Sequence, residues 1–142
     1  MTDDSEDVTT YRLTGSRRGR RSMRVDTGDA TFDVDSDLNP VEYLLGSVIG
    51  CLNFTATRVA REMNVEIDDL NATVEGDVDY SAYKGEQTNA RAGLQEIRVV
   101  LSVSTDADEE TLDEWLQAVE RRCPVSETVA NGTAIGAAVE RQ

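Results

Sequence analysis

The sequence predicts an α+β fold, and three features of the chain lead to this expectation. Segments in which apolar and polar residues alternate, as in half-buried strands, stand on both sides of a long apolar helical segment at 40–63. An amphipathic helical segment follows at 108–122, and an alternating segment closes the chain. Strands and helices mixed in this order are typical of α+β domains. At 142 residues the chain suits one domain, expected over residues 8–142, with a disordered acidic tail at residues 1–7.

The N-terminal third is expected to form short strands. Residues 8–14 and 22–25 are predicted as strands around a segment rich in glycine and arginine at 15–21. Residues 30–34 alternate in the same way. The tetrapeptide Asp-Thr-Gly-Asp at 26–29 is typical of a hairpin turn and is expected to join the last two strands.

The first helix has a clear start. Asn39 is a favourable N-cap, Pro40 suits the first helical position, and Glu42 stands three residues after the cap, as in a capping box. One stripe at helical spacing carries Leu44, Val48, Cys51, Leu52, Thr55 and Val59. Gly46 and Gly50, one turn apart, offer a small surface that another helix can approach. Because the helix is apolar on more than one face, we expect it to be central and buried.

Two longer strands are expected after this helix. Residues 70–78 and 94–103 alternate between apolar and polar side chains, and the segment between them, 79–93, is a polar loop with two glycines. The pattern therefore predicts a pair of strands joined by a long loop.

The second helix is expected over 108–122. Its apolar stripe consists of Leu112, Trp115, Leu116, Val119 and Cys123, so Trp115 is interpreted as a core residue and the Cys123 side chain is expected to point into the core. Pro124 interrupts this helix. Residues 126–131 are expected to form one more helical turn before a last strand at 133–140.

The charge balance is strongly acidic. The net charge is −14, from 28 acidic against 14 basic residues, and Lys84 is the one lysine. An acidic excess of this kind indicates adaptation to high salt, as in halophiles, because salt screens the self-repulsion. It argues against general nucleic-acid binding, which requires a positive surface. The arginine cluster at 17–21 leaves a phosphate or RNA patch open as an alternative.

The chain shows no segment that predicts secretion or membrane insertion. The first seven residues include four acids, unlike a signal peptide. The longest apolar run, 43–52, is about half of what a membrane span requires. We therefore expect a cytoplasmic protein, in which thiols stay reduced and paired cysteines are more often catalytic than structural.

Two cysteines, Cys51 and Cys123, and the absence of histidine define the chemistry that the sequence offers. Two cysteines alone cannot fill a tetrahedral zinc site, so no metal is expected. If the two sulfurs meet in the fold, thiol–disulfide chemistry follows, with one thiol attacking and the other resolving. The alternative is that both are inert core residues, because free cysteine is among the most buried residue types.

The segments around these cysteines resemble the OsmC/Ohr family of osmotically inducible and organic hydroperoxide resistance proteins. Asn-Pro-Val-Glu-Tyr-Leu-Leu at 39–45, followed by Cys51, is similar to the first cysteine helix of that family. Cys-Pro-Val-Ser at 123–126 is similar to its second cysteine motif. Gly-Ser-Arg-Arg-Gly-Arg at 15–20 resembles the stretch that supplies the family's active-site arginine. The resemblance extends over about residues 11–140.

This resemblance implies a thiol-dependent peroxidase that reduces organic hydroperoxides. The implied assembly is an intertwined homodimer, with central helices packed against curved antiparallel sheets and active sites at the interface. No cofactor is bound, and an external dithiol, often a lipoyl group, is the implied reductant. In the organic hydroperoxide branch a glutamate stands where this chain has Val41. The acid is shifted here to Glu42, as in the wider OsmC-like branch.

The resemblance also assigns roles to individual residues. Cys51 attacks the peroxide and becomes a sulfenic acid, which Cys123 condenses into a disulfide. A thiolate near neutral pH requires a positive neighbour. Without histidine this is an arginine, for which the motif favours Arg17, with Arg18, Arg20 and Arg24 as alternates. Glu42 is expected to orient that arginine.

Purely structural interpretations of these residues remain open. Glu42 is also explained as a capping-box acid, and Arg17 as a solvated charge in a basic turn. For the whole protein, two other functions remain: an OsmC-like protein that binds a small apolar ligand or a persulfide without peroxidase activity, and an interaction module with inert thiols.

Overall fold

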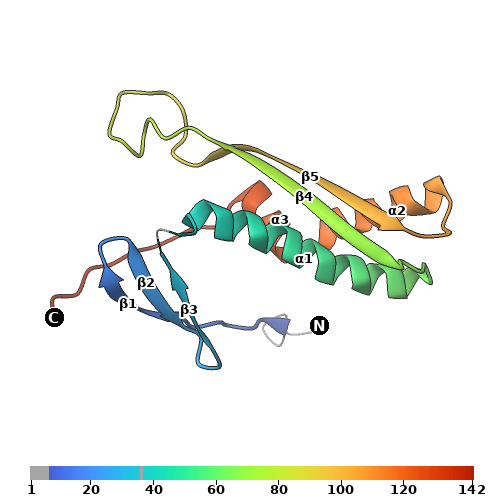
Figure 1. Ribbon diagram of the computed structural model, residues 1–142, viewed down its shortest axis with the longest axis horizontal. Coiled ribbons are helices and arrows are strands. Elements are labelled where there is room, and N and C mark those ends of the chain that lie inside the picture. The colour runs from blue at the N-terminus through green and yellow to red at the C-terminus, as the bar shows by residue number, and fades with distance from the viewer. Residues whose placement is uncertain (1–6, 36) are drawn as a thin grey trace, which may run out of the picture. The chain divides into compact units, whose positions relative to one another are not determined.

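The computed structural model describes residues 7–35 and 37–142 (Figure 1). Most of the expected acidic tail, residues 1–6, lies outside the described residues. Contacts divide the chain into two compact units, 1–43 and 44–142, and the division falls within the first turn of the long helix. Among the described residues no helix is long and apolar enough to cross a membrane.

The first unit is a three-stranded antiparallel sheet in the order β1-β2-β3. The strands are β1 (Thr14–Gly19), β2 (Ser22–Asp26) and β3 (Thr31–Val34). The predicted turn between the last two is confirmed: Gly28 adopts a φ of 97°, which glycine tolerates without strain. Across β2 and β3 the Arg24 guanidinium donates two hydrogen bonds to the Asp33 carboxylate, at 2.8 and 3.1 Å.

The predicted strand at 8–14 is wrong. The first strand is instead β1, which includes most of the glycine- and arginine-rich segment that was placed between two predicted strands. Gly19 pairs with Ser22, so only Arg20 and Arg21 form the turn. A two-residue hairpin turn makes the residues directly before it the partners of those directly after it. This pairing outweighs the stronger strand propensity of the preceding apolar segment.

Helix α1 (Pro40–Met63) begins with the predicted capping box. The Asn39 side-chain oxygen accepts a hydrogen bond from the Val41 amide at 2.8 Å, and the Glu42 carboxylate accepts one from the Asn39 amide at 3.0 Å. The helix ends at Asn64, which adopts a left-handed φ of 56°. The predicted start and end of this helix are both confirmed.

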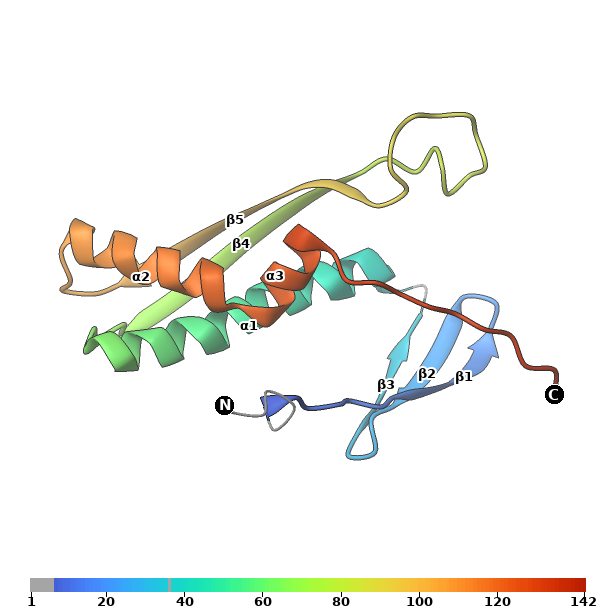
Figure 2. The same cartoon turned by 180° about the vertical axis from the view of Figure 1, so that it is seen from behind.

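The second unit pairs β4 (Asp69–Val78) with β5 (Leu94–Ser104) in one antiparallel hairpin, joined by the predicted loop. The views in Figures 1 and 2 both show this hairpin running along α1. At Gly76 a Cβ atom would come within 2.8 Å of the Leu94 side chain and 3.1 Å of the Leu45 side chain. Glycine therefore lets the hairpin approach α1 closely.

The last two helices are α2 (Glu109–Arg122) and α3 (Pro124–Asn131). The Asp108 carboxylate caps α2 by accepting a hydrogen bond from the Thr111 amide at 2.8 Å. Cys123 ends α2 and is the N-cap of α3. The third helix starts two residues earlier than predicted, because Pro124 occupies its first position, where the missing N–H costs nothing.

The core of the second unit lies between α1 and α2. The buried residues are Val48, Leu52, Ala56, Val59, Ala60, Trp115, Val119 and Cys123. The Trp115 indole N–H donates a hydrogen bond to the Ala56 carbonyl at 3.0 Å. The predictions that Trp115 is a core residue and that Cys123 points into the core are confirmed.

The predicted last strand at 133–140 is wrong. Gly132 ends α3 with a φ of 81°, and every residue from 133 to 142 is exposed and without regular structure. The segment alternates as a strand does, but a strand forms only where a neighbouring backbone supplies hydrogen-bond partners. Within the described part of the chain no segment pairs with it.

Candidate active site

The structure brings the two cysteines of the chain together. Cys51 lies midway along α1 and is partly buried, whereas Cys123 is fully buried at the junction of α2 and α3. Both are free thiols, and each affects the pKa of the other. The two helices that carry them are fixed by the core, so the fold positions the sulfurs before any chemistry starts.

Burial raises the pKa of the Cys51 thiol, and the neighbouring Cys123 raises it further. The Val125 backbone N–H and the Thr55 hydroxyl act in the opposite direction without cancelling the increase. Thr55 lies one turn after Cys51, and its hydroxyl also donates a hydrogen bond to the Cys51 carbonyl at 3.0 Å. Burial and Cys123 therefore hold the pKa of Cys51 above its ordinary value.

Cys123 shows the opposite behaviour. Burial alone would raise the pKa of the Cys123 thiol. The Ser126 hydroxyl, the Ser126 backbone N–H and the Cys51 thiol together outweigh burial and lower that pKa. The Ser126 groups act without forming a cap hydrogen bond to Cys123. The amide groups at the start of α3 thus favour negative charge on both sulfurs.

The predicted arginine and acid both belong to the first unit. Arg17 stands on the exposed strand β1, where its Nε donates a hydrogen bond to the Gly19 carbonyl at 3.2 Å. Arg24, an alternate, is engaged by Asp33. Glu42 closes the capping box and makes no ion pair with another described residue. The groups with the largest effect on Cys51 include no cation, so its activation by Arg17 stays a prediction.

Two residues of the thiol site, Thr55 and Ser126, were not singled out by sequence reasoning. The spacing of each residue from its cysteine is the sequence signal that identifies it. Thr55 follows Cys51 by four residues, which places both on one helix face. Ser126 follows Cys123 by three residues, the spacing between an N-cap and the amide that faces it.

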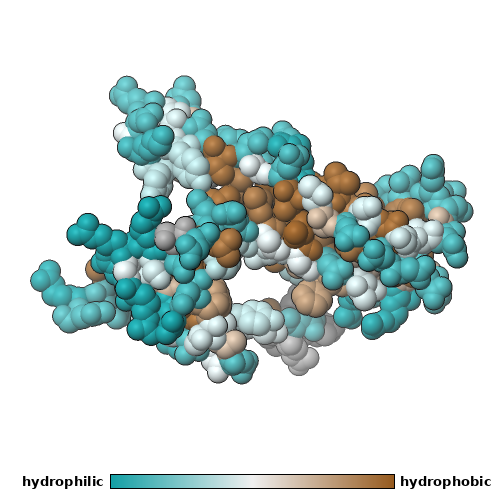
Figure 3. Space-filling view, in the orientation of Figure 1, coloured by the Kyte–Doolittle hydropathy of each residue, from teal (hydrophilic) through white to brown (hydrophobic). Residues whose placement is uncertain are grey.

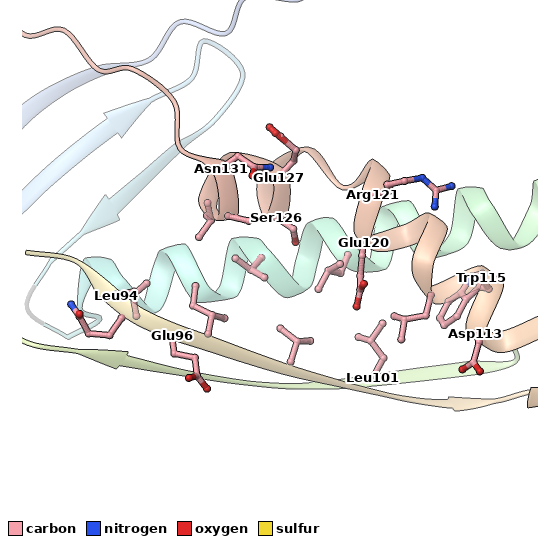
Figure 4. A pocket seen from close by; sticks show the side chains of 18 of the residues that line it. Leu94, Glu96, Leu101, Asp113, Trp115, Glu120, Arg121, Ser126, Glu127 and Asn131 are labelled. Carbon is pink, nitrogen blue, oxygen red and sulfur yellow. The ribbon is translucent and has the colours of Figure 1, made fainter. Parts of the chain in front are cut away.

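An apolar groove lies next to the thiol site. It has a volume of about 870 Å³ and is lined by β5 and the three helices, including Leu52, Val99, Leu101, Trp115, Ser126 and Val129. In Figure 4 the Ser126 side chain points from α3 toward α1, whereas Glu127 points away. Neither cysteine lines the groove, but Ser126 contacts it and acts on Cys123. Ser126 therefore stands between the groove and the thiols.

The described residues hold no cluster of three or more histidine, cysteine, aspartate or glutamate side chains that could bind a metal ion. The chemistry that the arrangement offers is that of the thiol pair: nucleophilic attack by one sulfur and disulfide formation with the other.

The family of the chain follows from comparison with known proteins. The family model described as OsmC-like protein matches residues 33–137. The chain belongs to the OsmC-like family. The predicted resemblance and the α+β OsmC-like fold are therefore confirmed. A comparison with curated proteins gave no match.

Solved structures of OsmC-like proteins share this fold. The OsmC-like protein from Mycoplasma pneumoniae aligns with a TM-score of 0.75 at 22% identity, over 86% of this chain and 88% of that one. The organic hydroperoxide resistance protein OhrB of Bacillus subtilis gives 0.56 at 26% identity, over 85% and 90%. An organic hydroperoxide resistance protein OsmC from Legionella pneumophila gives 0.61 at 16% identity, over 86% and 90%.

Proposed function

We propose that this OsmC-like protein is a thiol-dependent reductase of organic hydroperoxides, with a role in peroxide stress. One observation carries the proposal: the only two cysteines of the chain, far apart in sequence, lie close enough at the start of α3 for each to affect the pKa of the other. Family membership supports it, and so do the relatives named for organic hydroperoxide resistance.

The proposed reaction starts at Cys51, the more exposed thiol. Its thiolate attacks one peroxide oxygen, the O–O bond breaks, the alcohol leaves with a proton, and Cys51 becomes a sulfenic acid. Cys123 then attacks the Cys51 sulfur. The S–O bond breaks, water leaves, and a disulfide forms. An external dithiol, for which the family resemblance favours a lipoyl group, returns both thiols.

Cys51 requires help to ionise, because burial raises its pKa. Arg17 is the proposed source of positive charge, since a guanidinium stabilises a thiolate and donates hydrogen bonds to the departing oxygen. Glu42 is the proposed partner that orients Arg17. In this role one carboxylate oxygen of Glu42 stays in the capping box and the other is available to the arginine.

The proposed assembly is a homodimer. At Gly46 and Gly50 nothing lies within 4 Å of where a Cβ atom would stand, and Phe54 on the same helix is 80% exposed. Figure 3 shows apolar side chains gathered over the region of α1 and the β4–β5 hairpin.

Gly50→Leu would fit within the described chain but would block a partner helix. Light scattering at molar salt should show a dimer for the wild type and dissociation for Gly50→Leu, and a monomeric wild type would contradict the proposal.

We further propose that the protein works at high salt and in the cytoplasm. An acidic surface with one lysine supports function at high salt. A cycle that depends on reduced thiols supports a cytoplasmic location. Residual activity measured across a range of salt concentrations tests the first, and localisation of the tagged protein tests the second.

Single-cysteine variants test the reaction. Cys51→Ser should abolish consumption of an organic hydroperoxide. Cys123→Ser should allow one attack and then stop, with Cys51 found by mass spectrometry as sulfenic or sulfinic acid. Thr57→Ser, at an exposed position of α1, is the matched control and should keep full turnover. If both cysteine variants keep multi-turnover activity, the disulfide mechanism is wrong.

The groove favours a second candidate, the binding of a small apolar ligand without peroxidase activity. Its volume of about 870 Å³ suits such a ligand, and Ser126 connects it to the thiols. Titration with an apolar fluorescent probe distinguishes the two. Tight binding by a protein that consumes no hydroperoxide would favour the ligand-binding function.

A further inference from the structure

The groups at the start of α3 interact differently with the two cysteine sulfurs. Cys123 is the N-cap residue of α3, and Ser126 is the third residue after it, so its amide and its hydroxyl are near enough to lower the pKa of the Cys123 thiol. Cys51 comes from another helix, and the group of α3 that lowers its pKa is the Val125 amide. The two sulfurs of a Cys51–Cys123 disulfide would therefore differ in how well each accepts the negative charge when the bond breaks.

No cation in the described surroundings supplies this stabilisation instead. Arg122 precedes Cys123, but its guanidinium donates hydrogen bonds to Glu62 at 2.6 and 3.1 Å. Arg121 points away from α3 in Figure 4. The groups that act most strongly on Cys123 are Ser126, Cys51 and Thr55, and none of them carries a formal charge. Ser126 is therefore the side chain best placed to stabilise a Cys123 thiolate.

Access to the two sulfurs is also unequal. Cys123 is fully buried, with 0% of its surface exposed, whereas Cys51 is partly exposed. An external thiol can therefore reach Cys51 and cannot reach Cys123 without opening the core. Access makes Cys51 the sulfur that an external thiol attacks. Charge stabilisation makes Cys123 the leaving thiol, because a thiol departs faster in disulfide exchange when its thiolate is more stable.

We propose that Ser126 is a positioning residue that directs disulfide exchange, so that a reducing dithiol attacks the Cys51 sulfur and Cys123 departs as a thiolate stabilised by Ser126. In this step a bond forms between the reductant sulfur and Cys51, the Cys51–Cys123 bond breaks, and its electron pair leaves with Cys123. The second thiol of the reductant then attacks the first, closes a cyclic disulfide and releases Cys51. The inference rests on the disulfide cycle of the proposed function.

The site of attack can be located directly. The purified full-length protein is oxidised to the disulfide with diamide and then treated with 2-mercaptoethanol, a monothiol that cannot complete the exchange by cyclising. Iodoacetamide quenches the reaction, and peptide mass spectrometry locates the adducts. We expect the mercaptoethanol adduct on Cys51 and the alkyl group on Cys123. The reverse distribution, or an equal one, overturns the inference.

The role of Ser126 is tested by its variants. Ser126→Ala should slow reduction of the disulfide by roughly three- to tenfold, the order expected when a thiolate leaving group loses a stabilising polar neighbour. Ser126→Thr should restore most of the rate, because it returns the hydroxyl. Thr128→Ala, at an exposed position of the same helix, is the matched control and should react as the wild type does. A wild-type rate in Ser126→Ala overturns the inference.

A titration separates this role from a merely structural one. In a Cys51→Ser background, the ultraviolet absorbance of the thiolate reports Cys123 alone. Ser126→Ala should raise the midpoint of that titration, and Ser126→Thr should return it toward the starting value. An unchanged midpoint overturns the inference. Because diamide forms the disulfide, these experiments are independent of peroxide turnover, so failure of the peroxidase proposal and failure of this one are distinguishable.

Discussion

The contact between Trp115 and Ala56 allows a quantitative test of how the fold holds the thiol pair. Trp115 belongs to α2, which leads to Cys123, and Ala56 belongs to α1, which carries Cys51. The indole N–H donates to the Ala56 carbonyl at 3.0 Å, and the ring is 3% exposed. Trp115→Phe keeps an aromatic ring but removes this donor and part of the buried volume.

The expected cost of Trp115→Phe is about 2 kcal/mol in the free energy of unfolding. The lost hydrogen bond accounts for about 1 kcal/mol, because the Ala56 carbonyl keeps its bond within α1 and is not left unpaired. The space left by the smaller ring adds about 1 kcal/mol, well below the roughly 3–5 kcal/mol of complete truncation to alanine. With a slope of about 2 kcal/mol per molar urea, the midpoint of unfolding should fall by about 1 M.

Urea titration followed by circular dichroism measures this change, and Leu116→Ala is the control, because Leu116 is 37% exposed. A second readout is the rate at which diamide forms the Cys51–Cys123 disulfide, which should fall when α1 and α2 are less firmly held. An unfolding midpoint of Trp115→Phe equal to that of the wild type would refute the reasoning. So would a larger loss of stability in Leu116→Ala than in Trp115→Phe.

Three further predictions concern the predicted site residues. Arg17→Ala should raise the pH at which Cys51 reacts with iodoacetamide, and Arg17→Lys should recover part of the difference; an unchanged profile would move the role to another arginine. Glu42→Gln keeps a capping side chain, so its stability should stay near wild type while peroxide turnover falls; unchanged turnover would leave Glu42 with the capping role alone. In Cys123→Ser the Cys51 thiol loses the neighbour that helps to raise its pKa, so its alkylation by iodoacetamide should begin at lower pH than in the wild type; an unchanged or higher pH would contradict this effect of Cys123.

The helices could be predicted from sequence because their signals are local. The capping box at Asn39 and Glu42 places the start of α1 through contacts within one turn. Asp108 does the same for α2. The apolar stripe that contains Trp115 and Cys123 correctly identified the buried face of α2. Such features depend on neighbours within a few residues, so the sequence contains the information that they require.

The strands show where local information ends. The segment at 133–140 has strand-like alternation, yet it is exposed and unpaired in the described chain. The segment at 15–21 was placed between two predicted strands, yet most of it forms β1 because the turn at Arg20 and Arg21 pairs it with β2. Strand formation depends on hydrogen bonds to another segment, and that partner is not encoded in the alternation itself.

The sequence by itself determined that Cys51 and Cys123 lie on the apolar faces of two helices and that they are the candidate pair for thiol chemistry. Only the tertiary structure decided that the sulfurs meet, that Cys51 is the more exposed, and that Ser126 favours charge on Cys123. The reason is physical. The pKa of a thiol depends on burial and on the dipoles around it. For these two thiols, those dipoles come from α1 and α3, which are distant in sequence and become neighbours only when the core forms.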